Sequence, residues 1–344
     1  MTIHAILILP ATNRVYADAS VRLTRTELGV FNDSVLGGRL HDITERRLAG
    51  VRYVTFTAPE LTERDIAFLS NLSSLYALFE VHDDLLRPVP VRRLDRFDDD
   101  LISIQKYAGK TNEYFTKLLL NVTALATATP SDLIDRRLAV LDPLCGRGTT
   151  LNQALMYGFD AAGVDLDRKD FDAYAAFIRT WLQHKRIKHR AEAGPVRRNR
   201  AVVARRLQVT LGDTKERYRA GEVTTLTVLN ADTTKSREFF RPATFDLVVT
   251  DAPYGVQHGS RAAAALSRSP TDLLADALPV WAELVRPGGA VGIAWNTYLA
   301  RREQLARLLA DNSFEVLDSP PYLGFAHRVD QAIHRDLIVA RKPA

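Results

Sequence analysis

The stretch LDPLCGRGTT, residues 141–150, decides the fold of this 344-residue chain. An apolar run leads into it, a turn with Gly146 and Gly148 follows, and a helical pattern begins at Thr149. Glycines in such a turn let the backbone approach a ligand closely, and the first turn of a helix offers unpaired N–H groups. The stretch therefore predicts a ligand-binding turn between a strand and a helix.

The kind of ligand follows from what the turn contains. It has no third glycine at the G-x-G-x-x-G spacing of a dinucleotide site, and no Lys before Thr149 as in a phosphate-binding P-loop. Asp142 precedes the turn, and its charge would repel a phosphate but attract an ammonium or sulfonium group. The turn thus favours a cationic cofactor such as S-adenosylmethionine. The candidate contacts in it are Asp142, Pro143, Cys145, Gly146, Gly148 and Thr149.

Outward from this turn, from about residue 101 onward, apolar strand-like runs alternate with helical patterns. Strands are predicted at residues 138–141, 161–164, 226–229, 245–250, 290–295, 314–317 and 336–340. A helical stretch at residues 111–128 precedes them. This alternation predicts a doubly wound, Rossmann-like α/β sheet.

Three more carboxylates follow predicted strands. Asp165 ends the second strand, Asp232 follows the third and Asp251 follows the fourth. Ligands of open α/β sheets bind at the carboxyl ends of the strands, so we expect Asp165 to accept hydrogen bonds from ribose and Asp232 from an adenine amino group. A single aspartate in such a place is usually a turn or N-cap residue, but four together with a glycine turn favour a site.

Residues 142–150, Asp165 and residues 251–255 resemble the motifs of class I S-adenosylmethionine-dependent amino-methyltransferases. Their Asp/Asn-Pro-Pro-Tyr catalytic motif is similar to Asp251-Ala252-Pro253-Tyr254, with alanine in place of the first proline. The residue before a proline is restricted to extended conformations, so we expect the loop to be softer but usable, and Ala252→Pro to be tolerated.

The flanking segments narrow the resemblance. Residues 106–112 (KYAGKTN), 118–121 (LLLN) and 334–339 (HRDLIV) resemble the tRNA guanosine-N2 methyltransferases that act at guanosine 10, and their RNA-methylase relatives. The likeness covers residues 101–344. It implies a class I methyltransferase fold, S-adenosylmethionine as cofactor with Thr111 and Asn112 among its contacts, an RNA substrate, tRNA first, and no metal.

The motif suits the chemistry of an exocyclic amine, whose lone pair is delocalised into the base. Asp251 can accept a hydrogen bond from the amine, and the carbonyl of Ala252 or Pro253 can accept a second one. Two acceptors would orient the lone pair toward the methyl group and stabilise the charge that develops on nitrogen. Tyr254 can stack on the base, while Asp251 also borders the cofactor.

The N-terminal part has a different character. Residues 1–85 read as a small α+β domain with strands near 51–58 and 76–81 and a helix at 62–70, and residues 86–100 read as a linker. The first hundred residues carry 12 basic and 15 acidic side chains. An RNA-binding charge must therefore come from the methyltransferase domain, residues 101–344.

That charge is concentrated in residues 184–206, which contain nine basic side chains and one acidic one. Such a segment can follow a phosphate backbone, although most charge runs are solvated loops. We expect an RNA-contacting insertion between the second and third strands, outside the core. The candidate contacts are Lys185, Arg186, Lys188, Arg190, Arg197, Arg198, Arg200, Arg205 and Arg206.

Composition excludes several classes of protein. With 46% hydrophobic and 25% charged residues the chain is neither fibrous nor disordered, and a single cysteine cannot form an intrachain disulfide. No apolar run reaches the ~18 residues of a membrane span. No secretory signal is visible, and no ligand spacing suggests a metal. We therefore expect a cytoplasmic protein without a metal or a membrane partner.

Other functions remain open from the sequence. The same chemistry could serve adenine in nucleic acid, a protein amide or a small-molecule amine. DNA enzymes with this motif order usually carry a large recognition domain after the catalytic part, which lowers that alternative. A non-catalytic RNA-binding protein with the same fold is the other possibility. Tyr322, His327 and Arg328 precede the last strand, where they either touch RNA or have structural roles.

Overall fold

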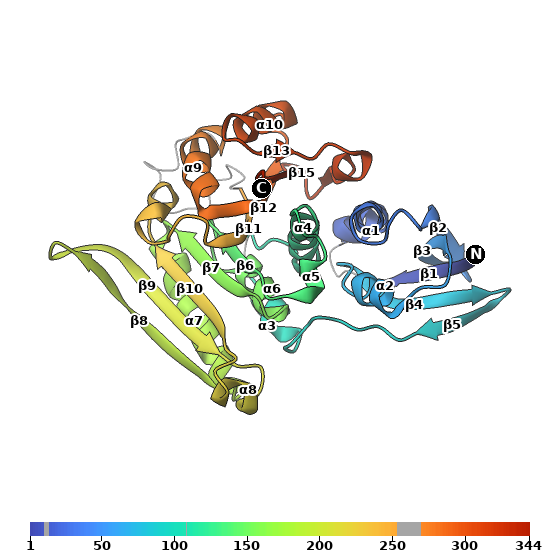
Figure 1. The fold of residues 1–344 in the computed structure, drawn as a ribbon, viewed down its shortest axis with the longest axis horizontal. Helices are drawn as coiled ribbons and strands as arrows, with labels where there is room; N and C mark the ends of the chain where they lie inside the picture. Colours follow the sequence, from blue (N-terminus) through green and yellow to red (C-terminus); the bar gives the residue numbers. More distant parts are fainter. Residues whose placement is uncertain (10–13, 108, 253–269) are drawn as a thin grey trace.

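The computed structural model describes residues 1–344 except 10–13, 108 and 253–269 (Figure 1). The described residues form two sheets, a five-stranded antiparallel one near the N-terminus and a ten-stranded mixed one. The predicted combination of a doubly wound sheet with a small α+β unit is thereby confirmed. None of the helices in the described ranges combines the length and apolar character needed to cross a membrane.

The N-terminal unit contains β1 (Thr2–Ile8), α1 (Arg14–Ser34), β2 (His41–Leu48), β3 (Val51–Ala58), α2 (Glu63–Leu69), β4 (Leu75–His82) and β5 (Leu85–Val89). Its strand order is β2-β3-β1-β4-β5. The predicted helix start is where the sequence places it, because the Thr62 hydroxyl accepts the Asp65 N–H at 3.1 Å and caps α2. Strand β2 was not predicted, since its residues HDITERRL are mostly polar and exposed.

The connection between the units starts later than predicted. Residues 86–89 pair with β4 as part of β5, so the linker begins at residue 90. It is anchored along its length: the Arg96 N–H donates to the Met156 carbonyl at 2.8 Å, and the Arg96 guanidinium pairs with Asp213 at 2.8 Å. Gly158, at φ +70°, leaves room for the Arg96 side chain where a Cβ would collide with it.

The elements of the second unit follow in chain order: α3 (Asp100–Ser103), α4 (Glu113–Leu125), α5 (Asp132–Asp135), β6 (Ala139–Asp142), α6 (Thr149–Met156), β7 (Asp160–Asp165), α7 (Arg168–His184), β8 (His189–Arg198), β9 (Ala201–Leu211), α8 (Lys215–Arg219), β10 (Thr224–Asn230), η1 (Thr233–Glu238), β11 (Phe245–Asp251), α9 (Pro270–Leu284), β12 (Val285–Asn296), α10 (Arg302–Asp311), β13 (Glu315–Val316), η2 (Pro320–Leu323), β14 (His327–Arg328) and β15 (His334–Arg341). The strand order is β13-β15-β12-β11-β6-β7-β10-β9-β8. The five central strands, from β12 to β10, are parallel. This is a doubly wound sheet with antiparallel strands at both sides.

The central strands are buried on both faces, as parallel strands usually are. In β11, Leu247 and Val249 belong to the core under α4, α6 and α7, whereas Val248 belongs to the core under α9 and α10. Successive side chains therefore serve opposite layers, and the near-continuous apolar runs in the sequence follow from this arrangement.

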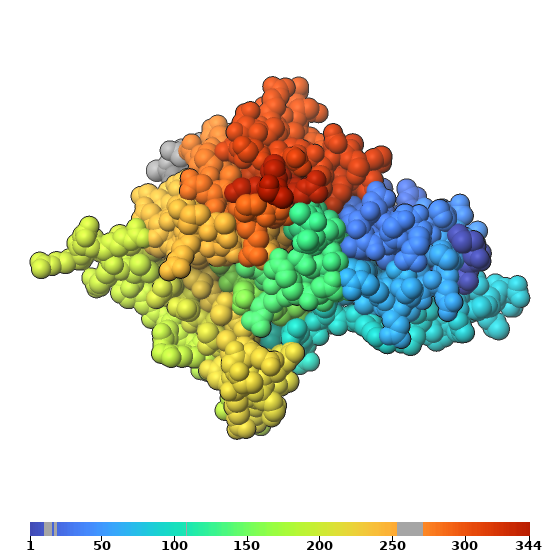
Figure 2. Space-filling view, viewed as in Figure 1, coloured from blue at the N-terminus to red at the C-terminus, as the bar shows by residue number. Residues whose placement is uncertain are grey.

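The basic segment is part of the sheet, which corrects the prediction of an insertion outside the core. The segment does lie between β7 and β10 in the chain. However, β8 and β9 form a hairpin, and β9 pairs antiparallel with β10 over the whole length of β10. Leu207, Val209 and Leu211 of β9 are buried against the core. Asn199 and Arg200, at φ +47° and +67°, form the tight turn at the tip. The hairpin stands out from the body of the molecule (Figure 2).

The two units share one hydrophobic core. Phe31 of α1 and Phe56 of β3 belong to the same cluster of buried side chains as Leu118 of α4 and Leu247 of β11. Helices α1 and α4 lie side by side at this boundary (Figure 1). The N-terminal unit is thus packed onto the layer that covers the large sheet.

Candidate functional site

The candidate site lies at the carboxyl edge of the parallel strands. Strand register places Asp142 beside Gly163 and Asp165 beside Asn230, so the ends of β6, β7 and β10 meet. The chain adds strands on one side of β6 up to β10 and then returns to the other side with β11. Such a reversal of strand order is where open α/β sheets bind ligands.

The glycines of the predicted turn have a left-handed backbone conformation. Gly146 has φ +48°, and Gly148 has φ +78° at the N-cap of α6. A Cβ on Gly148 would collide with the ring of Tyr174, so this position also needs the small residue for space. The Cys145 N–H donates to the Val164 carbonyl at 3.0 Å and ties the turn to β7.

Asp165 is fastened to this turn. Its Oδ2 accepts the Gly146 N–H and its Oδ1 accepts the Asp167 N–H, both at 2.7 Å. Burial is the main cause that raises the pKa of Asp165 to about 6. Each carboxylate oxygen has a second lone pair, so these bonds leave capacity for ribose hydroxyls, which stay a prediction.

Asp142 is buried at the end of β6. Its Oδ1 accepts the Thr250 hydroxyl at 2.8 Å and the Leu144 N–H at 3.1 Å. Burial raises the pKa of Asp142 to about 7. The Thr250 contact couples the glycine turn to the end of β11, one residue before Asp251.

For Pro143, Cys145 and Thr149, the remaining predicted contacts in the turn, the structure shows contacts within the protein, and a cofactor contact stays a prediction. Pro143 is buried, and the Thr149 hydroxyl lies 3.2 Å from the Tyr107 hydroxyl. Burial raises the pKa of the Cys145 thiol well above its usual range, which keeps the thiol protonated and agrees with a loop residue instead of a nucleophile.

Two of the predicted cofactor contacts act as helix caps. Asp232 caps η1, because its Oδ1 accepts the Thr234 N–H at 2.9 Å. Asn112 caps α4 by accepting the N–H groups of Tyr114 and Phe115 at 3.0 and 3.2 Å. Asp232 thus has the capping role that the sequence left open, and Asn112 has one that the sequence analysis did not consider. For both residues a cofactor contact remains a prediction.

Asp251 is held from two sides at the end of β11. Its Oδ2 accepts the Thr111 hydroxyl at 2.6 Å and faces the Arg335 guanidinium at 3.3 Å. Arg335 is only 4% exposed and lies over the ring of Phe115, 4.7 Å from its centroid. Sequence reasoning missed Arg335 as a site residue. The signal that could have found it is a basic residue at the start of an otherwise apolar strand.

Ala252 differs from its expected behaviour. It is buried, and its N–H donates to the Ala294 carbonyl at 2.8 Å, which extends the β11–β12 ladder by one bond. A proline has no N–H to make this hydrogen bond, so the structure gives a reason against the expected tolerance of Ala252→Pro, which stays to be measured. Pro253 and Tyr254, predicted as catalytic, lie outside the described residues.

Three of the nine predicted RNA contacts are neutralised by local carboxylates. Lys185 pairs with Asp98 and Asp100 at 2.7 and 2.6 Å, and Arg190 pairs with Glu192 at 2.5 Å. Within the described ranges, no ion pair involves the other six: Arg186, Lys188, Arg197, Arg200, Arg205 and Arg206.

The third neutralised residue, Arg198, joins the hairpin to η1. Its guanidinium pairs with Glu238 at 2.8 Å and lies over the ring of Phe239, 5.6 Å from the centroid. This contact fixes the tip of the hairpin against an element that follows the carboxyl end of β10.

The register of the hairpin separates the six remaining cations. In the β9–β10 ladder Arg205 lies opposite Asn230, at the carboxyl end of β10. The tip with Arg197 and Arg200 therefore extends past the edge of the sheet that carries Asp165. Arg186 and Lys188 precede the start of β8, whose His189 lies across from Leu211 at the opposite edge. The tip, together with Arg205 and Arg206 at the carboxyl end of β10, is therefore on the side of the candidate site, and Arg186 and Lys188 are not.

A cavity of about 300 Å³ is lined by residues from the start of α4, the start of β15 and α1. Its walls include Tyr107, Thr111, His327 and Arg335, together with Tyr16 of α1 from the N-terminal unit. Two of these residues, Thr111 and Arg335, are the partners of Asp251 described above. Asp251 itself is not among the lining residues, so the cavity is next to the partners of the carboxylate that the sequence predicted to be catalytic.

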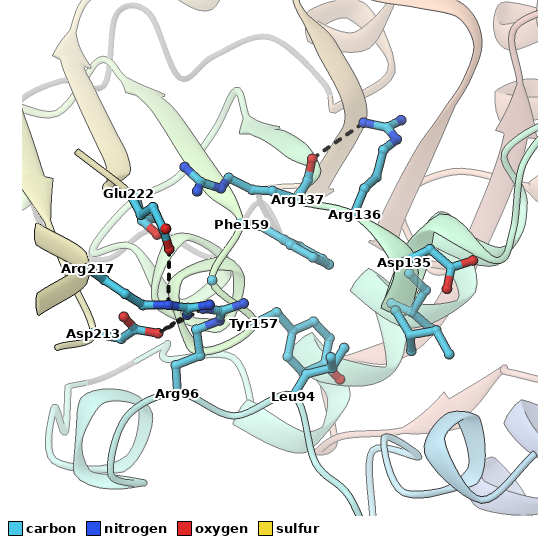
Figure 3. Close-up of a pocket in the computed structure, with 14 residues that line it drawn as sticks. Leu94, Arg96, Asp135, Arg136, Arg137, Tyr157, Phe159, Asp213, Arg217 and Glu222 are labelled. Atoms are coloured by element: carbon cyan, nitrogen blue, oxygen red, sulfur yellow. Dashed lines mark hydrogen bonds and ion pairs between the residues drawn. The ribbon is translucent and has the colours of Figure 1, made fainter. Parts of the chain in front are cut away.

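A second cavity, of about 270 Å³, is lined by Arg96, Arg136, Arg137 and Arg217 (Figure 3). Its cations are already paired, since Arg217 and Arg96 share Asp213 and Arg217 also faces Glu222 at 3.3 Å. It lies near the amino ends of the parallel strands, at Thr224 and Phe159, and away from the candidate site. In the part of the chain that the structure describes, no three His, Cys, Asp or Glu side chains gather as metal ligands would.

Comparisons with known proteins give structural likeness only. No protein-family model matches the chain, and no curated protein does. Among solved structures, TrmN from Thermus thermophilus shares 19% identity over 75% of this chain at a TM-score of 0.41, and the match spans 56% of that protein's length. The magnesium protoporphyrin IX methyltransferase from Synechocystis PCC 6803, with bound SAH, shares 11% sequence identity at a TM-score of 0.39. That match covers 69% of this chain and 90% of the methyltransferase. A TehB-like SAM-dependent methyltransferase from Corynebacterium glutamicum shares 15% sequence identity at a TM-score of 0.33. That match covers 62% of this chain and 84% of the other protein. At these scores the fold assignment rests on the strand order of the sheet itself.

Proposed function

We propose that this protein is an S-adenosylmethionine-dependent N-methyltransferase that methylates the exocyclic N2 amine of a guanosine in RNA, with tRNA as the first candidate. The observation that carries the proposal is the position of Asp251. It ends β11 at the reversal of strand order, beside the glycine turn on β6, and is held by Thr111 and Arg335. A carboxylate in that place can receive an amine while a cofactor occupies the turn.

The residues of the turn fit the cofactor. Gly146 and Gly148 bring the backbone into a left-handed turn. Apart from Gly146 and its chain neighbours, no heavy atom of the described residues lies within 4 Å of the point where a Cβ on Gly146 would be. Asp165 and Asp142 supply carboxylates for ribose hydroxyls and for a positive charge. S-adenosylmethionine, when bound, supplies a methyl group that a nucleophile can take from a positively charged sulfur.

The chain's contribution to the chemistry is orientation and charge. Asp251 would accept a hydrogen bond from the amine and direct its lone pair toward the methyl group. As the N–C bond forms, positive charge grows on nitrogen, and the nearby carboxylate stabilises it. Thr111 and Arg335 keep the Asp251 carboxylate in one orientation, because both contact the same oxygen, Oδ2. The excess proton then leaves the methylated nitrogen.

The tip of the β8–β9 hairpin supports a polyanionic substrate. Arg197 and Arg200 are exposed there, and they are on the same edge of the sheet as Asp165 and Asp251. Cations on that edge can neutralise backbone phosphates while a nucleotide occupies the site.

The test is methyl transfer to unmodified tRNA transcripts with isotopically labelled S-adenosylmethionine, followed by mass spectrometry of the nucleosides. We expect N2-methylguanosine. Asp251→Asn should lower kcat by about 10²-fold or more with an unchanged cofactor Kd. Asp165→Ala should instead weaken cofactor binding by ~2–4 kcal/mol, because two charge-assisted hydrogen bonds would be lost.

The outcomes separate the alternatives. Label in N6-methyladenosine would make adenine the acceptor, and label that no RNA takes up would move the acceptor to a protein amide or a small amine. A protein that binds RNA without binding S-adenosylmethionine would be a non-catalytic relative, and the proposal would then be wrong.

A further inference from the structure

The cavity next to the partners of Asp251 contains a hydrogen-bond acceptor that none of the described residues uses. His327 lines this cavity and is 3% exposed. Its Nδ1 lies 2.8 Å from the Phe325 carbonyl, which can only accept, so Nδ1 carries the proton. The other nitrogen, Nε2, is then a lone-pair acceptor. It is buried without a hydrogen-bond partner among the residues that the structure describes.

The surroundings keep this imidazole neutral. Burial is the main cause that lowers the pKa of His327 to about 4, and the nearby guanidinium groups of Arg335 and Arg22 lower it further. The ring packs against Phe115, 5.2 Å between centroids. A buried acceptor left without a donor costs free energy that a ligand's N–H or O–H group would recover.

The mouth of the cavity is cationic. Lys106 and Arg328 line it and are exposed, and neither forms an ion pair with any side chain in the described ranges. Lys110, also in the wall, pairs with Glu113 at 3.5 Å. The cavity thus combines a buried neutral acceptor and aromatic side chains inside with positive charges at its opening that no described carboxylate neutralises.

We propose that this cavity binds the target nucleotide, and that His327 Nε2 accepts a hydrogen bond from a neutral N–H or O–H group of that nucleotide. The phosphate lies toward Lys106 and Arg328, and the base or sugar lies in the aromatic interior. His327 is then a specificity-determining residue of the acceptor site, an inference that rests on the proposed function because the cavity borders the partners of Asp251. A nucleotide meets all three features of the cavity, whereas a free small amine leaves its cations without a partner.

The test measures binding by calorimetry, using the full chain saturated with S-adenosylhomocysteine and guanosine 5′-monophosphate as the probe. We expect the wild-type protein to bind it, and His327→Phe to weaken binding about 10-fold or more with the same affinity for S-adenosylhomocysteine. His327→Gln, which keeps a side-chain acceptor, should recover part of the loss. Lys106→Ala with Arg328→Ala should weaken binding of the monophosphate but not of guanosine.

A matched control exists in the N-terminal sheet. His4 is also buried, has an unpartnered ring nitrogen in the described structure, and stacks on Phe56 outside the cavity. His4→Phe should leave nucleotide binding unchanged. If His327→Phe keeps its melting temperature and binds the monophosphate like wild type, or if wild type does not bind it, the inference is wrong. If the wild-type protein does not bind S-adenosylmethionine, or transfers no methyl group, that result would instead count against the proposed function.

Discussion

Asp251 and Arg335 are 84 residues apart in the chain and meet at the carboxyl edge of the sheet. Arg335 is 4% exposed and Asp251 side-chain atoms are 16% exposed, so the charges are largely removed from water. Breaking such a pair from one side leaves a buried charge without its partner. Substitutions of Asp251 therefore change both chemistry and stability, and the two effects must be measured separately.

A double-mutant cycle separates them. Asp251→Ala should lower the free energy of unfolding by about 3 kcal/mol, because Arg335 stays buried without this partner. The double variant Asp251→Ala with Arg335→Met should recover most of that loss in urea titrations. Methyl transfer should stay absent in both variants. Recovered turnover in the double variant would remove Asp251 from the chemistry.

Substitutions of Ala252 measure the contribution of a single backbone hydrogen bond, from the Ala252 N–H to the Ala294 carbonyl. Ala252→Pro removes the N–H that bonds to Ala294, and should destabilise the fold by about 1–3 kcal/mol in thermal or urea unfolding. Ala252→Gly keeps the N–H and serves as the control, with a smaller loss of about 1 kcal/mol or less. Equal stability of the proline variant and wild type would mean that this bond contributes nothing.

Cofactor binding should release protons. Burial raises the pKa of Asp142 to about 7 and that of Asp165 to about 6, so part of each carboxyl is protonated near pH 6.5. A positively charged sulfonium and hydroxyl donors favour the ionised form and lower both pKa values. S-adenosylmethionine affinity should therefore rise with pH from 5 to 8.

Calorimetry at pH 6.5 in buffers of different ionisation enthalpy measures this release directly. We expect a fraction of a proton up to about one proton per cofactor, and less for Asp165→Asn. Binding enthalpies that do not depend on the buffer would mean that neither carboxyl changes its protonation on binding.

At the scale of elements, the hairpin of β8 and β9 divides one charge run into two ends. Arg197→Glu with Arg200→Glu at the tip should weaken tRNA binding and lower the salt slope by about two units. Arg186→Glu with Lys188→Glu at the other end makes the same change in charge and should have little effect. Filter binding across a range of salt measures both variants.

Arg198 is kept in this design because it holds the tip to η1 through Glu238. Equal losses for the two pairs of substitutions would mean that net charge alone attracts RNA, without a defined contact surface. Cofactor affinity should be the same in all variants, since the glycine turn is on other strands.

For the whole molecule, the boundary between the two units contains a buried polar network. Asn121 of α4 donates to Glu27 of α1 at 2.8 Å and to the Asn71 carbonyl at 2.8 Å, and it accepts the Tyr157 hydroxyl at 2.9 Å. Burial raises the pKa of Glu27, which is fully buried here. A network of this kind links the stability of both units.

Asn121→Leu should lower the free energy of unfolding by about 2–4 kcal/mol, because it leaves buried groups of both units without partners. Urea unfolding should remain one cooperative transition, since the two units share a core. Asn312→Ala is the control: it removes one hydrogen bond, to the Leu308 carbonyl at the partly exposed end of α10, and should cost about 1 kcal/mol or less. Two separate transitions in the wild-type protein would contradict the shared core.

Local sequence signals were enough to predict the strands, the turn and the helices that form the candidate site. The glycine turn at residues 146–148, the carboxylates at strand ends and the Thr62 cap depend on spacing within a few residues, which the sequence displays directly. The alternation of apolar runs with helical patterns was likewise sufficient for the doubly wound sheet.

Contacts between distant segments needed the folded structure. The pairing of Arg335 with Asp251, the shared core of α1 and α4, and the addition of a basic hairpin to the sheet edge all join residues far apart in the chain. A polar, half-exposed strand such as β8 has no apolar period that marks it, because only its ladder to β9 makes it a strand. The local spacing of residues does not indicate which distant segment will pack against them. These contacts are therefore determined only by the packing of the folded chain.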